Sequence, residues 1–177
     1  RSLYPLDASA RECGAVNIVK RVGEGLIGFN TDGEGLLNAL SDMGFVPSGA
    51  SVAILGRGGA ALAAAHALSS QGAGVTLLVR SRSLSPAHPF REELINGYNG
   101  QYDAFINATP LGMANEKSFG SFAMLRRLSP KLVFDMVYLQ NGETALVDYA
   151  RSQGINAQSG FAMLRAQALL ALKVWGL

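Results

Sequence analysis

The order of apolar and polar residues predicts a hairpin and then a helix at the start of the chain. Residues 15–29 hold two strand-like runs, "AVNIVKRV" and "GLIGF", and the "GEG" between them supplies the positive φ of a tight turn. In the next stretch, "DGEGLLNALSDMGF", the leucines recur at helical spacing, and Gly44 is placed to cap the helix end.

The first turn of this helix contains a carboxylate that has two possible roles. Thr31 followed by Glu34 matches the capping box T-x-x-E, which predicts that Thr31 caps the helix. Asp32 then takes the first helical position, where the helix dipole favours a negative charge. Asp32 either only starts the helix or also faces a cleft, and we expect Gly33 and Gly35 to leave its surroundings unobstructed.

Beyond residue 50, strand-like and helix-like runs alternate. The strand-like runs are "SVAIL", "GVTLLV", "YDAFINAT", "KLVFDMV" and "INAQ", and the helix-like runs are "GGAALAAAHALSSQG", "GETALVDYARSQG" and "FAMLRAQALLALKVW". This alternation is typical of βαβ units with right-handed crossovers. It predicts an α/β fold with a Rossmann-like, doubly wound, mainly parallel sheet and helices on both faces.

The segment "ILGRGGAALA" fits the G-x-G-x-x-G/A fingerprint of a dinucleotide-binding loop. Gly56 permits the tight turn, Gly58 allows backbone to approach a pyrophosphate, and Ala61 lets the helix pack closely on the strand. The N–H groups and dipole at the helix start favour a phosphate. The alternative is a glycine turn that serves packing alone.

The end of the next strand indicates which dinucleotide binds. An NAD site places an acid there, whereas this sequence has Arg80, Ser81 and Arg82 and no nearby acid. A guanidinium and a hydroxyl suit a 2′-phosphate, so NADP is favoured over NAD. The alternative is that these residues are solvated loop charges.

Composition narrows the class of protein. The 177 residues are 49% hydrophobic and 16% charged, as in a core-rich globular chain. The net charge of +2 is too mild to indicate nucleic acid or a membrane surface as a partner. The lone Cys13 excludes an internal disulfide and suits a reducing compartment, so we expect a cytoplasmic protein. His66 and His88 have no second ligand spaced nearby, so no metal site is predicted.

Six motifs, in order and spacing, resemble those of the shikimate dehydrogenase family. They are "GAVN" (14–17), "GFNTDG" (28–33), "LGRGGAA" (55–61), "INATPLGM" (106–113), "FDMVY" (134–138) and "GFAMLRAQ" (160–167). The resemblance implies an oxidoreductase that reversibly reduces 3-dehydroshikimate to shikimate with NADPH, in aromatic amino-acid and chorismate biosynthesis.

The resemblance also implies roles for individual residues. Asp32 would be catalytic and would face the substrate with Asn17 and Gln167, and Tyr138 would lie nearby. The cofactor phosphates and ribose would be lined by Gly56, Gly58, Gly59, Ala60, Arg80 and Ser81, and the nicotinamide side by Asn107, Thr109, Met136 and Gly160. By themselves, Asn17 could satisfy a strand edge and Gln167 could lie on a helix surface.

The sequence departs from the family at two positions in the cofactor site. Where the family commonly has a small residue this chain has Arg57, which either adds a charge to the phosphate site or points outward. Where the family has an asparagine this chain has Val79, which removes a polar contact to the adenosine end.

A third departure concerns the length of the chain. Family members carry an N-terminal substrate domain with a serine pair and a lysine that pairs with the aspartate. The chain starts at Arg1, and no lysine, Lys117 included, stands at the matching position, so we expect a C-terminal portion of a longer protein. We expect residues 1–47 to form the cleft rim, 48–156 the NADP-binding domain, and 157–177 a helix returning to the cleft.

Two other functions stay open from the sequence. One is a non-catalytic NADP-binding module. The other is a relative acting on quinate or another cyclic hydroxy acid, with NADP or NAD. The oligomeric state is not predicted.

Overall fold

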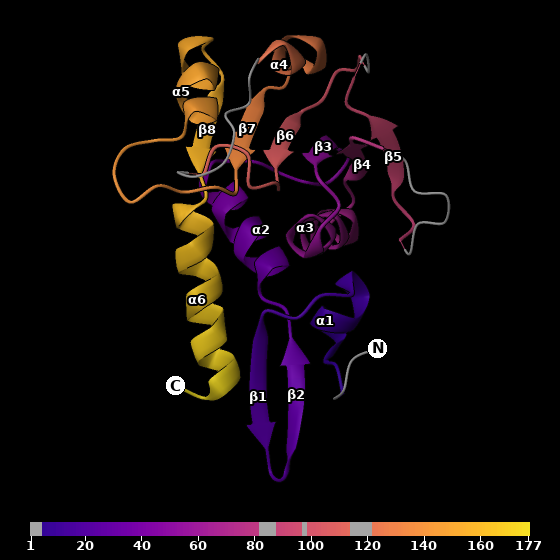
Figure 1. Cartoon of the computed structure of the whole chain (residues 1–177), viewed down its shortest axis with the longest axis vertical. Coiled ribbons are helices and arrows are strands. Elements are labelled where there is room, and N and C mark those ends of the chain that lie inside the picture. Colours follow the sequence, from indigo (N-terminus) through magenta and orange to yellow (C-terminus); the bar gives the residue numbers. More distant parts are fainter. Residues whose placement is uncertain (1–4, 82–87, 97–98, 114–121) are drawn as a thin grey trace.

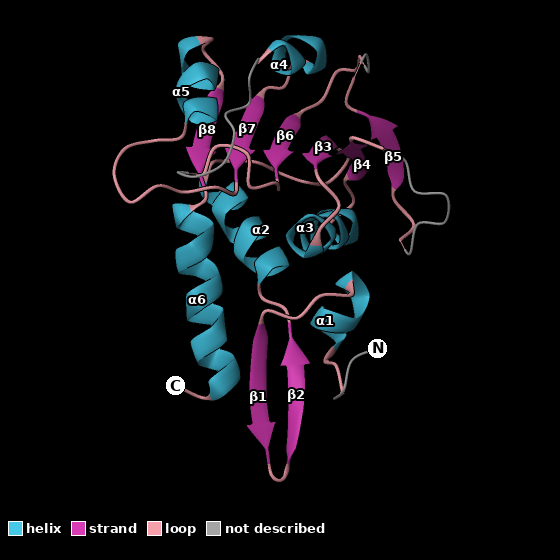
Figure 2. Cartoon of the chain, in the orientation of Figure 1, coloured by secondary structure: helices cyan, strands magenta, loops and turns pink. Residues whose placement is uncertain are grey.

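The computed structural model describes residues 5–81, 88–96, 99–113 and 122–177, so Arg82 and Lys117 lie outside the described residues. The helices are α1 (Ala8–Cys13), α2 (Asp32–Asp42), α3 (Gly59–Ser70), α4 (Ala123–Leu128), α5 (Ala145–Ser152) and α6 (Phe161–Trp175) (Figures 1 and 2). The strands are β1 (Ile18–Val22), β2 (Gly25–Phe29), β3 (Ser51–Leu55), β4 (Gly74–Val79), β5 (Arg91–Leu94), β6 (Ala104–Asn107), β7 (Leu132–Asp135) and β8 (Asn156–Ser159).

Six strands form one parallel sheet in the order β5-β4-β3-β6-β7-β8, which confirms the predicted Rossmann-like α/β fold. The order reverses between β3 and β6, where Leu55 pairs with Asn107. In sheets of this kind, ligands bind outside the carboxyl ends of the strands at such a reversal. The loops after β3 and β6 therefore meet where a dinucleotide is expected.

The two faces of the sheet are buried by different helices. Alternate strand residues point to opposite faces, so Ile54 and Phe134 pack with α2, α3 and the start of α6, whereas Phe105 and Val133 pack with α4 and α5. All four side chains are fully buried. Burying one such side chain is worth about 1.5–3 kcal/mol, so both layers of helices are held firmly.

Helix α2 packs against α3 and α6 through its glycines. A Cβ on Gly33 would lie 2.8 Å from the Ala63 carbonyl oxygen, and a Cβ on Gly35 would lie 2.8 Å from the Gln167 Cβ. The expectation that these glycines leave open space around Asp32 was wrong. They are small because two neighbouring helices approach the α2 backbone there.

The predicted hairpin forms from β1 and β2, with Gly23 in the left-handed region at φ +58°. It projects away from the sheet on the side opposite to α4 and α5, and α6 runs beside it (Figure 1). The Trp175 indole N–H donates to the Val19 carbonyl at 3.1 Å and ties the end of α6 to β1.

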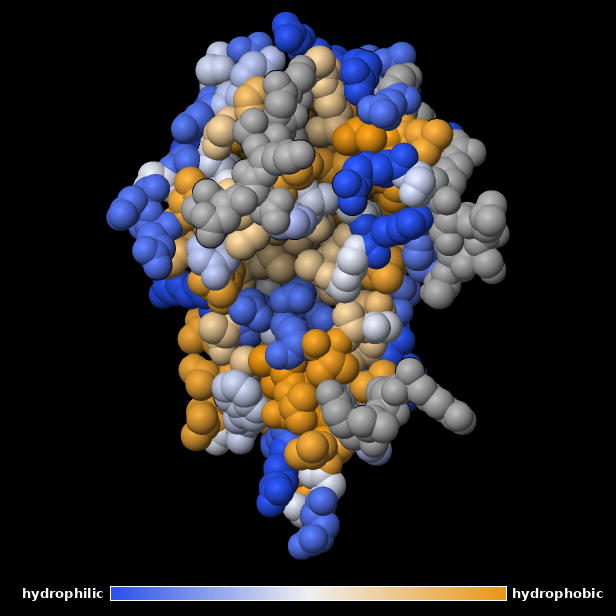
Figure 3. All heavy atoms as spheres, viewed as in Figure 1, coloured by the Kyte–Doolittle hydropathy of each residue, from blue (hydrophilic) through white to orange (hydrophobic). Residues whose placement is uncertain are grey.

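Apolar side chains are exposed on the hairpin and on the outer half of α6 (Figure 3). They include Val19, Val22, Leu26, Leu169, Leu172 and Trp175. None of the helices in the described ranges combines the length and the apolar character that a membrane crossing requires.

Candidate active site

The glycine loop joins β3 to α3, as the fingerprint predicted. Gly56 has φ +118°, and a Cβ there would lie 3.1 Å from the Ala108 carbonyl oxygen, so both conformation and space require glycine. A Cβ on Gly58, the residue before α3, would meet nothing within 4 Å. Ala61 is fully buried against the sheet. The loop is therefore closed on its inner side and open on its outer side.

A cleft of about 670 Å³ lies at this loop, between the ends of β3, β4 and β6. This volume falls within the range of sites for small molecules and cofactors. Among the predicted cofactor residues, those that line the cleft are Gly56, Gly58, Arg80, Ser81 and Thr109. Gly59 and Ala60 form the first turn of α3 beside it.

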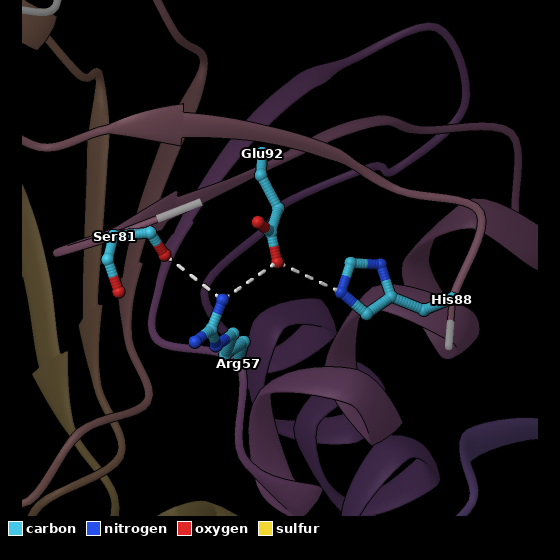
Figure 4. Close-up of polar contacts among 4 residues, drawn as sticks. All are labelled: Arg57, Ser81, His88 and Glu92. Atoms are coloured by element: carbon cyan, nitrogen blue, oxygen red, sulfur yellow. Dashed lines mark hydrogen bonds and ion pairs between the residues drawn. The ribbon is translucent and has the colours of Figure 1, made fainter. Parts of the chain in front are cut away.

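Arg57 crosses from the glycine loop to the end of β4 (Figure 4). Its Nη1 donates to the Ser81 carbonyl oxygen at 3.0 Å and lies 3.5 Å from Oε1 of Glu92. The same Glu92 oxygen lies 3.2 Å from His88 Nε2, and these two side chains are only 6% and 7% exposed. The guanidinium thus lies beside Ser81, and Arg57 lines the cleft.

Asn107 is fully buried and shapes the opposite wall. Its Nδ2 donates to Asp135 Oδ1 at 2.8 Å, and its Oδ1 accepts from the backbone N–H of Thr109 at 3.1 Å and from the Thr109 hydroxyl. Asp135 also accepts from the Thr144 hydroxyl at 2.7 Å. Burial raises the pKa of Asp135, and these hydrogen bonds oppose that effect. Asn107 therefore holds the loop that carries Thr109.

Met136 and Gly160 are brought together by their backbones. The Gly160 N–H donates to the Val137 carbonyl at 3.0 Å, and a Cβ on Gly160 would collide with the Met136 carbonyl. Only glycine allows α6 to start this close to the loop after β7.

Three of the predicted substrate residues converge, and none of them lines the cleft at the glycine loop. Asn17 Nδ2 lies 2.8 Å from Asp32 Oδ1, 3.1 Å from Gln167 Oε1 and 3.1 Å from Thr31 Oγ1. Nδ2 carries two hydrogens, so these three acceptors share them. Residues from before β1, from the start of α2 and from the middle of α6 thus form one polar cluster.

Thr31 occupies the N-cap position of α2 and Asp32 the first helical position, as predicted, but the expected capping hydrogen bond from the Thr31 side chain is absent. Its hydroxyl lies 3.3 Å from Gln167 Oε1 and makes no capping hydrogen bond, while Asn30 Oδ1 accepts from the Asp32 N–H at 2.9 Å. Thr31 is therefore a member of the polar cluster, whereas the sequence pattern had assigned its side chain to helix capping. Its contacts with Asn17 and Gln167 join residues far apart in the sequence, so no local pattern indicates them.

The carboxyl group of Asp32 is perturbed by its position. Burial raises its pKa, and the hydrogen bond from Asn17 partly offsets that rise. Tyr138, in the loop after β7, is 45% exposed, and no residue in the described part of the chain hydrogen-bonds to its hydroxyl. Nor do the described ranges bring three or more His, Cys, Asp or Glu side chains together as metal ligands.

Similar proteins are known both from sequence and from structure. A shikimate dehydrogenase (NADP(+)) from Geobacter metallireducens is 38% identical over 94% of this chain. The shikimate 5-dehydrogenase from Thermus thermophilus, solved in complex with NADP(H) and shikimate, is 31% identical over 97% of the chain, with a TM-score of 0.82. The chain is thus similar to shikimate dehydrogenases along nearly all of its own length.

The match to the shikimate dehydrogenase family covers only part of each relative. The chain spans 64% of the Geobacter protein and 66% of the Thermus protein. No protein-family model matches the chain. The ligand-free 5-ketofructose reductase of Gluconobacter has the same fold, with 28% identity over 97% of the chain, 66% of its own length and a TM-score of 0.73.

Proposed function

We propose that this chain carries the cofactor site and one side of the substrate site of an NADP-dependent shikimate dehydrogenase. The reaction is the reversible reduction of 3-dehydroshikimate to shikimate, a step toward chorismate and the aromatic amino acids. The observation that carries the proposal is the convergence of Asn17, Asp32 and Gln167 from three separate parts of a chain that also has a cleft at its glycine loop.

The cleft residues fit NADP. The open space at Gly58 and the N–H groups of Gly59 and Ala60 at the start of α3 suit the pyrophosphate. Arg80 and Ser81 would hold the 2′-phosphate. The nicotinamide side would be flanked by Asn107, through the loop it holds, and by Thr109, Met136 and Gly160.

The polar cluster suits the oxygen of the reacting ketone. NADPH, when bound, supplies the hydride that forms the new C–H bond, and the ketone oxygen then takes a proton to become the alcohol. Asp32 would orient that hydroxyl and take part in the proton transfer, because a carboxyl group with a raised pKa exchanges protons more readily near neutral pH. Asn17 and Gln167 would hold the ring hydroxyls, with Tyr138 nearby.

The division of the chain proposed from its sequence has support in this arrangement. The glycine loop comes from residues 48–156, whereas Asn17 and Asp32 come from residues 1–47 and Gln167 comes from residues 157–177. We also propose a cytoplasmic location, supported by Cys13, a free and buried thiol.

The test is shikimate-dependent reduction of NADP by the full-length product of the gene that encodes this chain. Asp32→Asn should lower kcat by at least about 100-fold, the lower range of acid–base contributions. The matched control is Asp42→Asn, an exposed carboxylate at the other end of α2, which should retain activity. Absence of turnover by the unaltered protein would contradict the proposal, and NADPH binding without turnover would favour a non-catalytic NADP-binding module.

A second candidate is reduction of a different polyhydroxylated ketone. It is favoured by the likeness to the 5-ketofructose reductase, which shares the fold at a similar sequence identity. Assays with shikimate, quinate and 5-ketofructose side by side separate the candidates, because the preferred substrate has the highest kcat/KM.

A further inference from the structure

We propose that Arg57 is a specificity-determining residue that binds the 2′-phosphate of NADP together with Arg80. The inference rests on the proposed function, because it requires an NADP site. It adds a second cation, from the glycine loop itself, to the site predicted at the end of β4.

The first support is the place of the guanidinium. Arg57 Nη1 reaches the Ser81 carbonyl oxygen at 3.0 Å, so the side chain spans from the glycine loop to the residue after Arg80. Both arginines and Ser81 line the same cleft. In dinucleotide-binding folds this strand end lies beside the adenosine ribose, whose 2′ position distinguishes NADP from NAD.

The second support is the number of donors left for a ligand. Both polar contacts of Arg57 use Nη1, so Nε and Nη2 have no hydrogen-bond partner within the ranges that the structure describes. The side chain is 42% exposed. A guanidinium binds phosphate with two parallel N–H bonds, and the remaining donors allow that geometry.

The third support is the contact that fixes Arg57 (Figure 4). Glu92 Oε1 lies 3.5 Å from Nη1, longer than the roughly 2.7–2.9 Å of a tight charge-assisted hydrogen bond. The carboxylate is buried and is also held by His88, so it is a fixed and weak anchor. Such an anchor orients the guanidinium without consuming its capacity to bind a phosphate.

The alternative is that Arg57 only ties the glycine loop to Ser81. A structural tie would affect NADPH and NADH equally, because they differ only in the 2′-phosphate. The ratio of the two dissociation constants therefore separates a phosphate ligand from a tie. Adenosine 2′,5′-bisphosphate and 5′-AMP provide the same comparison without the nicotinamide half.

The experiment titrates NADPH, NADH and the two adenosine probes against the full 177-residue chain and its variants. Arg57→Ala should weaken NADPH and the bisphosphate about 10- to 100-fold, as expected for a lost charged hydrogen bond, and change NADH and 5′-AMP less than about twofold. Arg57→Lys, which keeps the charge but not the planar fork, should lose less NADPH affinity than Arg57→Ala. The matched control, Arg126→Ala, which replaces an exposed residue of α4, should change none of them.

Equal losses of NADPH and NADH affinity in Arg57→Ala, or no loss, would overturn the inference. If Arg80→Ala alone lowers the preference for NADPH, the NADP site stands and only the role of Arg57 fails. If the unaltered chain binds neither dinucleotide, the proposed function fails first and this inference fails with it.

Discussion

The burial of Asp32, the residue proposed to take part in proton transfer, lowers the stability of the folded chain at neutral pH. Burial disfavours its charged form, so its pKa in the folded chain lies above the ordinary 3.8. A carboxyl group whose pKa is raised by folding stabilises the fold fully only at a pH below its pKa in the unfolded chain. That contribution is lost as the pH rises through its pKa in the folded chain. At neutral pH the ionised Asp32 is therefore unfavourable for stability, as is common for groups that sites require.

Replacing Asp32 by asparagine should raise stability at neutral pH. The uncharged amide can still accept the hydrogen bond from Asn17 and carries no burial penalty for a charge. We expect the Tm at pH 7 to rise by about 2–4 °C, the shift produced by ~1 kcal/mol in a chain of this size. The difference should shrink as the pH falls below 3.8, which thermal melts followed by circular dichroism will measure.

Asp103→Asn is the matched control, because folding shifts the pKa of Asp103 in the opposite direction. The hydrogen bond from Lys131, and those from Ser51, lower the pKa of Asp103 to about 2. Its contribution is present above 3.8 and is lost as the pH falls toward 2, so the variant should be less stable at pH 7. A lower Tm for Asp32→Asn at pH 7 would contradict the burial penalty.

Sequence motifs identified most of the polar cluster but not the contacts that the Thr31 hydroxyl makes with it. Asn17, Asp32 and Gln167 were placed by resemblance, and the structure brings them together. The capping box is a local pattern. Thr31 is the N-cap residue, but its hydroxyl contacts Gln167, and the Asp32 N–H donates to the side chain of Asn30 instead. A contact between residues 136 positions apart has no local signal.

At the scale of elements, the contacts of α2 determine where Asp32 and Gln167 of the polar cluster lie. Gly33 faces α3, and Gly35 faces the α6 residue Gln167, so the glycines set the distance between the helices. The position of Gln167 relative to Asp32 depends on that distance.

Gly35→Ala should separate α2 from α6. The new Cβ would meet the Gln167 backbone nitrogen and Cα at 3.1 and 3.2 Å, so the backbone of α6 must shift. Overpacking of this kind costs about 1–3 kcal/mol, offset in part by the roughly 1 kcal/mol by which alanine exceeds glycine in helix propensity. We expect a lower urea midpoint and a loss of shikimate affinity in the full-length protein.

Gly74→Ala is the matched control for this prediction. Its Cβ would have only an ordinary contact, 3.9 Å from the Ala50 carbonyl oxygen. If Gly35→Ala is as stable as Gly74→Ala, then α2 and α6 are not held at the separation seen in the structure.

The longer helices and the apolar strands were predictable from the pattern of their apolar residues. The run "FAMLRAQALLALKVW" was predicted as a helix with the same bounds as α6. By contrast, α1 and α4 have six residues each, too few to show a helical period. The edge strand β5, "REEL", was also missed, because it carries charged residues where a buried strand would be apolar.

For the whole molecule, stability should decrease with distance from the sheet. The central strands β3, β6 and β7 are buried on both faces by helices. The hairpin of β1 and β2 projects from this core and exposes Val22 and Leu26. A two-stranded hairpin is marginal by itself, so its order depends on neighbours such as Trp175.

Hydrogen exchange should show this gradient. We expect amides in the hairpin to exchange at least about 100-fold faster than those in β3 and β6, which corresponds to roughly 3 kcal/mol in opening free energy. Trp175→Phe removes the indole N–H that binds the Val19 carbonyl, so it should accelerate exchange in the hairpin and leave β3 unchanged.

Added NADPH should slow exchange at residues 56–62 and 107–111 without protecting the hairpin. Equal exchange in the hairpin and the sheet would mean that they open as one unit, in which case Trp175→Phe should destabilise both alike.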